Sequence, residues 1–268
     1  MNREDLQALA AVRRRAKELA AAVRLVTASF AAGGRLIYAG AGTSGRLGVL
    51  DAAECPPTFS TDPAMVVGVI AGGAAALKRS VEQVEDDPAA GAAAIRALAV
   101  KPSDVVIGIA AGGTTPFVHG ALAEAHRRQA KTIFLTCTDR RQVRAAVDLF
   151  IGLPTGPEVI AGSTRLKAAT ATKLALNTIS TLAMVQMGKV YGNLMVDLDV
   201  TRNRKLTDRG LRIIMELTAL KRRQAARLLA RAGGKVKRAV VMHRHHCTAA
   251  EADRRLEQAA GKLRVLIG

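Results

Sequence analysis

The sequence predicts a doubly wound α/β fold, with a mainly parallel five-stranded sheet flanked by helices and a small C-terminal helical appendage. Short apolar runs alternate with helical patterns over residues 36–187, which is the order expected of βαβ units. Of the 268 residues, 49% are hydrophobic but only 3% are aromatic. A core of Val, Ile, Leu and Ala suits helices packed closely on a parallel sheet. Only amphipathic helical patterns follow residue 203, so we expect two domains, residues 1–203 and 204–268.

The expected elements follow one another in a regular order. Each strand is a short apolar run bounded by turn residues, and these runs cover residues 36–39, 65–70, 104–110, 132–136 and 149–153. Helical spacing of apolar residues predicts helices over residues 5–31, from Thr43 or Ser44 to a stop at Pro56-Pro57, and over 74–85, 116–129 and 163–187. In the second domain, helices are expected over residues 206–217, 220–232, 236–243 and 249–267.

The chain is strongly basic. Its formal net charge is +18, and residues 201–268 alone carry 18 Lys and Arg against 5 Asp and Glu. Such an excess can mark a nucleic-acid-binding surface or the solvated faces of basic helices. Since no zinc finger, helix-turn-helix signature or set of stacking aromatics accompanies the charge, we expect solvated faces and no nucleic-acid partner. A nucleic-acid binder would show an affinity that falls steeply with salt.

Cysteine use and the start of the chain predict a cytoplasmic protein. Cys55, Cys137 and Cys247 lie far apart, which argues for a reducing compartment and against a disulfide framework. No signal peptide opens the chain, and no apolar segment is suited to span a membrane. Adjacent histidines in the segment 243–247 (HRHHC) would point in different directions on a helix, so we expect no metal site there.

A glycine-rich loop follows the first expected strand, with the sequence GAGTSG over residues 40–45. This pattern formally fits a dinucleotide loop, but no acidic residue follows the second strand to hold a ribose. Gly42, Thr43 and Ser44 instead place backbone N–H groups and hydroxyls at a helix N-terminus, which suits a phosphate monoester. The alternative is an ordinary capped helix start.

A second hydroxyl-rich segment precedes the long helix, GPEVIAGSTRLKAATATK over residues 156–173. Ser163 and Thr164 are expected at the helix start, and Lys167 adds charge to its first turns. Positive charge opposes the helix macrodipole at this end, and a bound anion would resolve the conflict. Two such helix starts in one domain favour a phosphate ligand and require no cofactor.

Together these segments resemble the N-acetylmuramic acid 6-phosphate etherases, a family of the sugar-isomerase (SIS) fold related to glucokinase regulatory proteins. The matching stretches are residues 34–57 (GRLIYAGAGTSGRLGVLDAAECPP), 67–87, 156–173, 188–197 (GKVYGNLMVD) and 205–206. The resemblance implies a phosphorylated amino sugar as substrate and a homodimer. Members of this family usually carry a longer segment before the position of Met1, so we expect either an internal start or a shortened variant.

The resemblance also implies the reaction, which is removal of a D-lactyl ether by elimination followed by addition of water. The family's two catalytic glutamates fall on Glu54 and Glu85, which we expect to act as acid and base. A helix end just before Pro56-Pro57 disfavours a carboxylate at Glu54, which suits a proton donor. Retention of both glutamates favours an enzyme over a non-catalytic phosphosugar-sensing regulatory protein. The ECPP motif at 54–57 argues against an isomerase.

The loop after the third strand departs from the family, which usually reads ASGRTP there. This chain reads AGGTTP over residues 111–116, so Gly112 and Thr114 replace a serine and an arginine. Gly112, Thr114 and Thr115 still offer N–H groups and hydroxyls, and we expect weaker binding of the phosphosugar or an altered ligand. Because Ser44 and Glu54 lie ~15 Å apart on one expected helix, we also expect the site to be shared across the dimer.

Overall fold

The computed structural model describes residues 1–198, 200 and 204–268. These residues form two compact units, the first made of Met1–Glu54 and Asp62–Ala183, the second of Cys55–Thr61 and Met184–Gly268. The expected boundary between residues 203 and 204 stays a prediction, because residue 203 lies outside the described residues. None of the helices in the described part of the chain is both long and apolar enough to cross a membrane.

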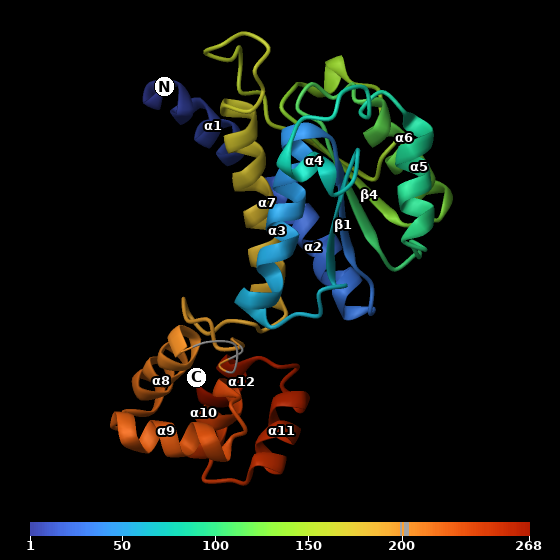
Figure 1. Cartoon of the computed structure of the whole chain (residues 1–268). Coiled ribbons are helices and arrows are strands. Elements are labelled where there is room, and N and C mark those ends of the chain that lie inside the picture. The colour runs from blue at the N-terminus through green and yellow to red at the C-terminus, as the bar shows by residue number, and fades with distance from the viewer. Residues whose placement is uncertain (199, 201–203) are drawn as a thin grey trace. The chain divides into compact units, whose positions relative to one another are not determined.

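The first unit is built on a five-stranded parallel sheet, as predicted (Figure 1). Its strands are β1 (Leu36–Gly40), β2 (Val66–Ile70), β3 (Val105–Ile109), β4 (Lys131–Thr136) and β5 (Leu149–Gly152). They lie in the order β2-β1-β3-β4-β5. β1 and β3 are buried along their whole length, as expected for central strands of a sheet covered on both faces.

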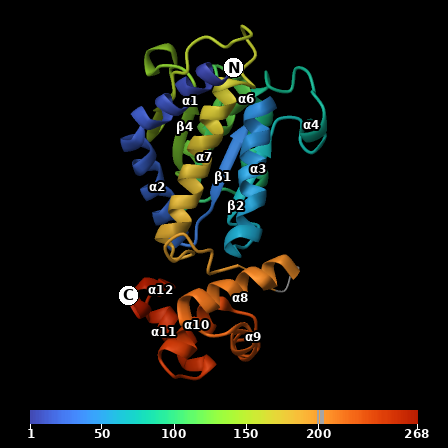
Figure 2. The same cartoon turned by 90° about the vertical axis from the view of Figure 1, so that its left-hand side faces the viewer.

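Helices cover both faces of this sheet. One face carries α2 (Ala16–Ala31), α3 (Gly42–Phe59) and α7 (Lys167–Gln186), with α1 (Asn2–Arg14) beside them (Figure 2). The other face carries α5 (Pro88–Ala97) and α6 (Pro116–Arg127), while α4 (Ala75–Lys78) and a 3-10 turn (Arg140–Gln142) lie in loops. The core between the sheet and α6 contains aliphatic side chains such as Ile37, Val106 and Val118, together with Phe117 and Phe134. This arrangement confirms the predicted doubly wound fold.

Two predicted helices have different bounds. The single helix expected over residues 5–31 is interrupted at Arg15, which separates α1 from α2. The stop expected at Pro56-Pro57 is wrong, because α3 continues to Phe59. A proline lacks an N–H donor but its carbonyl still accepts, and the Ser60 N–H donates to the Pro56 carbonyl at 3.0 Å.

The helix predicted over residues 74–85 is also wrong. Only the four residues of α4 are helical, and the chain then turns until Asp87 caps α5. The Asp87 carboxylate accepts from the N–H groups of Ala89 at 2.8 Å and Ala90 at 3.0 Å. The sequence analysis did not identify α5, although an Asp-Pro pair is a recognisable helix start.

Helices α5 and α6 touch through glycines. A Cβ atom built on Gly91 would lie 1.9 Å from the Phe117 carbonyl oxygen, and one on Gly120 would lie 1.9 Å from the Pro88 carbonyl oxygen. No side chain fits into either contact. The position of α6, and of the loop that precedes it, therefore depends on these two glycines.

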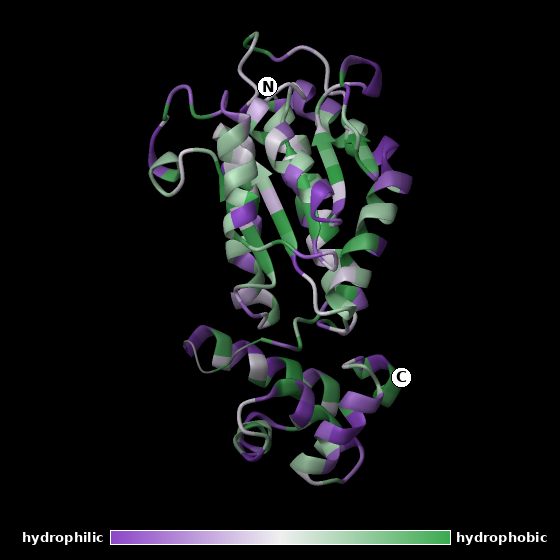
Figure 3. Cartoon of the chain, turned by 90° about the vertical axis from the view of Figure 1, so that its right-hand side faces the viewer, coloured by the Kyte–Doolittle hydropathy of each residue, from purple (hydrophilic) through white to green (hydrophobic). Residues whose placement is uncertain are grey.

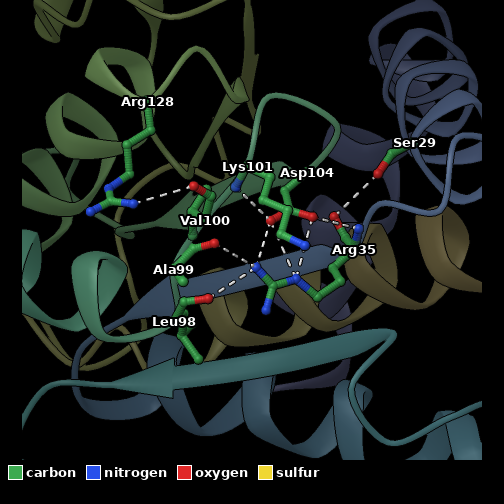
Figure 4. A network of polar contacts seen from close by, with 8 residues as sticks. All are labelled: Ser29, Arg35, Leu98, Ala99, Val100, Lys101, Asp104 and Arg128. Atoms are coloured by element: carbon green, nitrogen blue, oxygen red, sulfur yellow. Dashed lines mark hydrogen bonds and ion pairs between the residues drawn. The ribbon is translucent and has the colours of Figure 1, made fainter.

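The amino-terminal edge of the sheet is held by a buried ion pair (Figure 4). Arg35, just before β1, donates to the Asp104 carboxylate, just before β3, with a shortest distance of 2.6 Å. Burial alone would raise the pKa of Asp104, but hydrogen bonds from Arg35 and the Lys101 N–H hold it below its ordinary value. This network lies at the edge opposite the strand ends discussed below, so its role is structural.

The second unit contains five helices among its described residues: α8 (Arg204–Thr218), α9 (Arg222–Arg231), α10 (Val236–Arg244), α11 (Ala249–Gln258) and α12 (Leu263–Ile267). Their inner faces form an aliphatic core around Ile214, Leu229 and Val240. The colouring in Figure 3 shows purple and green alternating along these helices, as amphipathic helices require. The single helix predicted over 249–267 is wrong, because the chain turns at Gly261, with φ of +73°, between α11 and α12.

Candidate functional site

The carboxyl ends of the five parallel strands meet at one edge of the sheet. The connection after β1 leads to β2 on one side, whereas β3 lies on the other side of β1. Gly40 at the end of β1 is paired with Ile109 at the end of β3. Ligands of doubly wound sheets bind outside such a switch point. The loops that follow β1 and β3 are therefore the first place to look for a site.

The loop after β1 starts α3 at Gly42, whose φ is +50°. A Cβ atom on Gly45 would lie 2.7 Å from the Gly40 carbonyl oxygen, so this loop packs tightly on its strand. Gly42, Thr43 and Ser44 are half-buried. The free N–H groups of a helix start and the two hydroxyls there form the kind of site that binds a phosphate.

The loop after β3 flanks the same switch point. The His119 ring nitrogen Nε2 lies 2.8 Å from the Gly113 carbonyl oxygen, and Gly113 adopts a φ of +76°. These contacts fix the loop while Gly112 and Thr114 remain exposed. Thr115 is the N-cap residue of α6, and no side-chain cap bond is present there among the described residues. The structure thus brings the Gly112–Thr115 hydroxyls and N–H groups beside the first loop.

Glu85 lies near these loops, in the turn before α5. The Phe117 N–H at the start of α6 donates to the Glu85 carbonyl oxygen at 3.0 Å, while the Glu85 side chain is exposed. Glu85 and Gly42 line one small cavity of about 80 Å³, together with Arg46. Arg46 also donates to the Arg79 carbonyl at 3.0 Å. Arg46 was not predicted as a site residue, although a cation two residues after Ser44 can signal an anion site.

Glu54 lies farther along α3. It is exposed and lies ten residues after Ser44 on the same helix, or ~15 Å at 1.5 Å per residue. Because α3 continues to Phe59, the prediction that Glu54 lies at a helix end is wrong. Pro56 and Pro57 still lack the N–H groups that would pair with the carbonyls of the preceding turn.

A buried carboxylate one turn before Glu54 fixes this part of α3. Asp51 accepts from the Tyr38 hydroxyl at 2.8 Å, the Asn177 amide at 2.6 Å and the Ser180 hydroxyl at 3.1 Å. These partners come from β1 and α7, so Asp51 joins α3 to both elements. The role of Asp51 could not be predicted, because nothing in the local sequence pattern shows which acidic residue is buried.

The third predicted loop has a different environment. Helix α7 begins at Lys167, so Ser163 and Thr164 precede it and the predicted helix start at Ser163 is wrong. The Glu158 carboxylate accepts from the N–H groups of Lys167 at 3.0 Å and Ala168 at 2.9 Å. A carboxylate of the chain itself therefore occupies this helix N-terminus.

The Lys167 ammonium is also engaged. It is buried and donates to Glu4 of α1 at 2.6 Å. This hydrogen bond lowers the pKa of Glu4. In this structure Lys167 therefore joins α7 to α1, and a phosphate would have to compete with Glu4 for it.

Other groups near the strand ends are inert. Burial raises the pKa of the Cys137 thiol to about 11, while its hydrogen bond with Thr172 has the opposite effect. The thiol donates to the Ala168 carbonyl at 3.3 Å. Within the described residues, no three His, Cys, Asp or Glu side chains are grouped so that they could hold a metal ion.

Comparison with known proteins agrees with this arrangement. Residues 18–126 match the model of the glucokinase regulatory protein N-terminal SIS domain. A solved phosphosugar isomerase-type protein involved in capsule formation, from Bacteroides fragilis, has the same fold, with a TM-score of 0.51 and 16% identity over 68% of this chain and 86% of its own.

Curated relatives are much closer in sequence. The N-acetylmuramic acid 6-phosphate etherase of Crocosphaera subtropica is 56% identical over 99% of this chain and 87% of its own length. The enzyme of the same name from Microcystis aeruginosa is 55% identical over the same shares. With more than half of its residues shared over nearly its whole length, the chain belongs to the N-acetylmuramic acid 6-phosphate etherase family.

Proposed function

We propose that this protein cleaves the D-lactyl ether of N-acetylmuramic acid 6-phosphate, which gives N-acetylglucosamine 6-phosphate and D-lactate. The identity of 53–56% to several etherases carries this proposal. The geometry supports it, because two hydroxyl-rich loops flank the switch point and a carboxylate lines the cavity beside one of them. The three widely spaced cysteines favour a reaction in a reducing compartment such as the cytoplasm.

The phosphate would bind at the loops after β1 and β3. The N–H groups at the start of α3 and the hydroxyls of Thr43 and Ser44 face this edge of the sheet, and Thr114 and Thr115 add hydroxyls from the second loop. The segment before α7 would complete the site with the hydroxyls of Ser163 and Thr164. Lys167 would join them only if the substrate displaces Glu4 from it.

The reaction requires a base and an acid. Glu85 would remove the proton at carbon 2 of the open-chain aldehyde, and Glu54 would protonate the departing ether oxygen. The electron pair of the broken C–H bond then forms the carbon–carbon double bond as the C–O bond breaks. Addition of water to this double bond completes the reaction. Since each step only moves protons and bonding electrons, no cofactor is needed.

One chain alone offers little space for this ligand. The cavity of about 80 Å³ beside Glu85 is well below the ~300–1,000 Å³ of ordinary small-molecule sites, and Glu54 lies ~15 Å along α3 from Ser44. We therefore propose a homodimer in which the partner subunit completes each site. Exposed leucines on α1 and α3, namely Leu6, Leu9 and Leu50, offer apolar surface for such an interface.

The first test replaces each glutamate by its amide. Glu54→Gln and Glu85→Gln should each lower the rate of D-lactate release by about 100-fold or more, as expected for loss of a general acid or base, with an unchanged circular dichroism spectrum. Asp86→Asn serves as the matched control, because Asp86 is an exposed neighbour of Glu85 and should leave the rate unchanged. Full activity in either glutamate variant would remove that residue from the mechanism.

The second test restores the usual family residues in the loop after β3. Gly112 and Thr114 are exposed, so Gly112→Ser with Thr114→Arg should fit without repacking. A charged hydrogen bond to phosphate contributes ~1.5–3 kcal/mol, so calorimetry should show binding of N-acetylmuramic acid 6-phosphate about 10- to 100-fold tighter. Unchanged or weaker binding would mean that the loop after β3 does not bind the phosphate group. Binding of the phosphosugar without any lactate release by the native chain would instead favour a regulatory protein, consistent with the SIS-domain match.

A further inference from the structure

The C-terminal unit contains a cavity that the proposed reaction does not use. Its volume is about 630 Å³, within the ~300–1,000 Å³ of ordinary small-molecule sites. All the residues that line it belong to the second compact unit, which includes Cys55–Thr61. Val196, Leu198 and Leu256 supply apolar wall.

The wall of this cavity includes a buried threonine whose hydroxyl has no partner among the described residues. Thr61 lines it and is only 6% exposed, and its Oγ1 atom makes no hydrogen bond to any of the residues that the structure describes. Buried side-chain hydroxyls nearly always have a partner in native proteins. The Thr61 hydroxyl therefore indicates a hydrogen-bonding ligand group in the cavity.

The cavity wall also has more positive than negative charges. Lys189 and Lys237 share one carboxylate, Asp197, at 3.2 Å and 2.8 Å, and Lys237 is buried. Arg238 is paired with Asp253, while Lys235 and Glu257 complete the charged lining. Four basic side chains thus face three acidic ones.

The titration of Lys237 agrees with this excess of positive charge. Burial lowers the pKa of Lys237, and the neighbouring Lys189 lowers it further, whereas Asp197 raises it. The negative charge of a bound anion would counter the effect of Lys189 on this pKa.

A helix start faces the same space. Gly233 and Gly234 adopt φ values of +60° and +77° and lead into α10, whose N-cap residue is Lys235. No side chain of the described residues caps it. The first N–H groups of α10 lack helical acceptors, and the helix macrodipole favours an anion at this end.

We propose that this cavity binds a small organic oxyanion, a carboxylate or a phosphate monoester. Lys189 and the first N–H groups of α10 bind the anionic group, the Thr61 hydroxyl donates a hydrogen bond to it, and the apolar wall holds the hydrocarbon part. The inference does not rest on the proposed reaction, because none of these residues belongs to the loops assigned to the reaction.

The test follows the backbone amide signals of Gly233, Gly234 and Lys237 in nuclear magnetic resonance spectra of the full chain. Inorganic phosphate and D-lactate are titrated separately, with sodium chloride at equal ionic strength as reference. Saturable shifts of these amides with phosphate support a phosphate monoester, and shifts with D-lactate support a carboxylate. No saturable shift with either probe would overturn the proposal.

Variants at Thr61 separate a site from a surface effect. Thr61→Val should weaken binding about three- to tenfold, the range for one hydrogen bond, without lowering the melting temperature of the free protein, because the lost hydroxyl has no partner to lose. Thr61→Ser should keep the affinity. Thr218→Val is the matched control, since the Thr218 hydroxyl bonds within α8 outside the cavity lining. Lys189→Gln should weaken binding at least tenfold, and an affinity unchanged in both Thr61→Val and Lys189→Gln would overturn the proposal.

Discussion

Asp104 is a buried charge at the amino-terminal edge of the sheet. It is 1% exposed and accepts from Arg35 and from the Lys101 N–H. Asp104→Asn removes the charge that faces the half-buried Arg35 guanidinium, and loss of a hydrogen bond to a charged group costs about 1.5–3 kcal/mol. The pKa of Asp104 in the folded protein is held below its ordinary value. The ionised carboxylate therefore contributes fully to the unfolding free energy above about pH 4, and this contribution is lost as the pH falls through the pKa of the folded state.

Urea unfolding of the native chain and of Asp104→Asn measures this directly. The difference between their unfolding free energies should be large at pH 7 and shrink steadily below about pH 4. Asp62→Asn is a suitable control, because Asp62 is exposed and its carboxylate accepts from the Ala64 N–H within its own turn. A difference that stays constant between pH 7 and pH 3 would contradict the assignment of the stabilisation to the ionised carboxylate.

The individual site residues show what a sequence can and cannot predict. The Gly42–Ser44 loop and the Gly112–Thr115 loop could be located, because a parallel sheet brings all its carboxyl ends to one edge. The ion pair between Lys167 and Glu4 could not be predicted, because the two residues are 163 positions apart. The sequence around Lys167 does not show which residue of another helix it will contact. Asp51 was missed for the same reason.

The contact between α5 and α6 depends on two glycines. Gly120→Ala places a Cβ atom 1.9 Å from the Pro88 carbonyl oxygen, so the helices must separate. Overpacking costs typically ~1–3 kcal/mol, and the gain of ~1 kcal/mol in helix propensity offsets only part of that. We expect a net loss of unfolding free energy in a urea titration.

The matched control for this change is Gly112→Ala. A Cβ atom there would meet only Thr114 Oγ1, at 3.8 Å, and the unfolding free energy should be unchanged. Equal stability of the two variants would show that α5 and α6 can separate at no cost. Because Phe117 at the start of α6 bonds to the Glu85 carbonyl, the Gly120→Ala variant should also release D-lactate more slowly.

The helices were predicted unevenly, for physical reasons. Regular apolar spacing located α6 and most of α7. The segment 74–85 has residues that favour a helix, but tertiary contacts of the Glu85 turn override this preference. Helix α5 was not predicted because its Ala-rich sequence has little apolar periodicity, although Asp87 and Pro88 mark its start. The Glu158 carboxylate, remote from the predicted first turn, sets where α7 begins.

The parallel order of all five strands followed from the alternation of apolar runs and helices, because crossover connections permit few topologies. Assembly could not be read in the same way, since an interface involves only surface residues. The homodimer is therefore tested directly. Light scattering should give twice the mass of the 28.1 kDa chain, and a monomer that still turns substrate over would exclude a shared site.

The sharpest test of the shared site mixes two inactive variants. If Glu85 acts beside the phosphate loop of its own chain and Glu54 comes from the partner subunit, a heterodimer of Glu54→Gln and Glu85→Gln has one site with both glutamates intact. Random exchange makes half of the dimers heterodimers, so activity should recover to about a quarter of the native rate in a twofold-symmetric assembly. If both glutamates of one chain served one ligand, every site in the mixture would lack one of them and D-lactate release would stay at the level of the separate variants. Dilution followed by mixing, with lactate measured over time, distinguishes the two arrangements without any structural assumption about the interface.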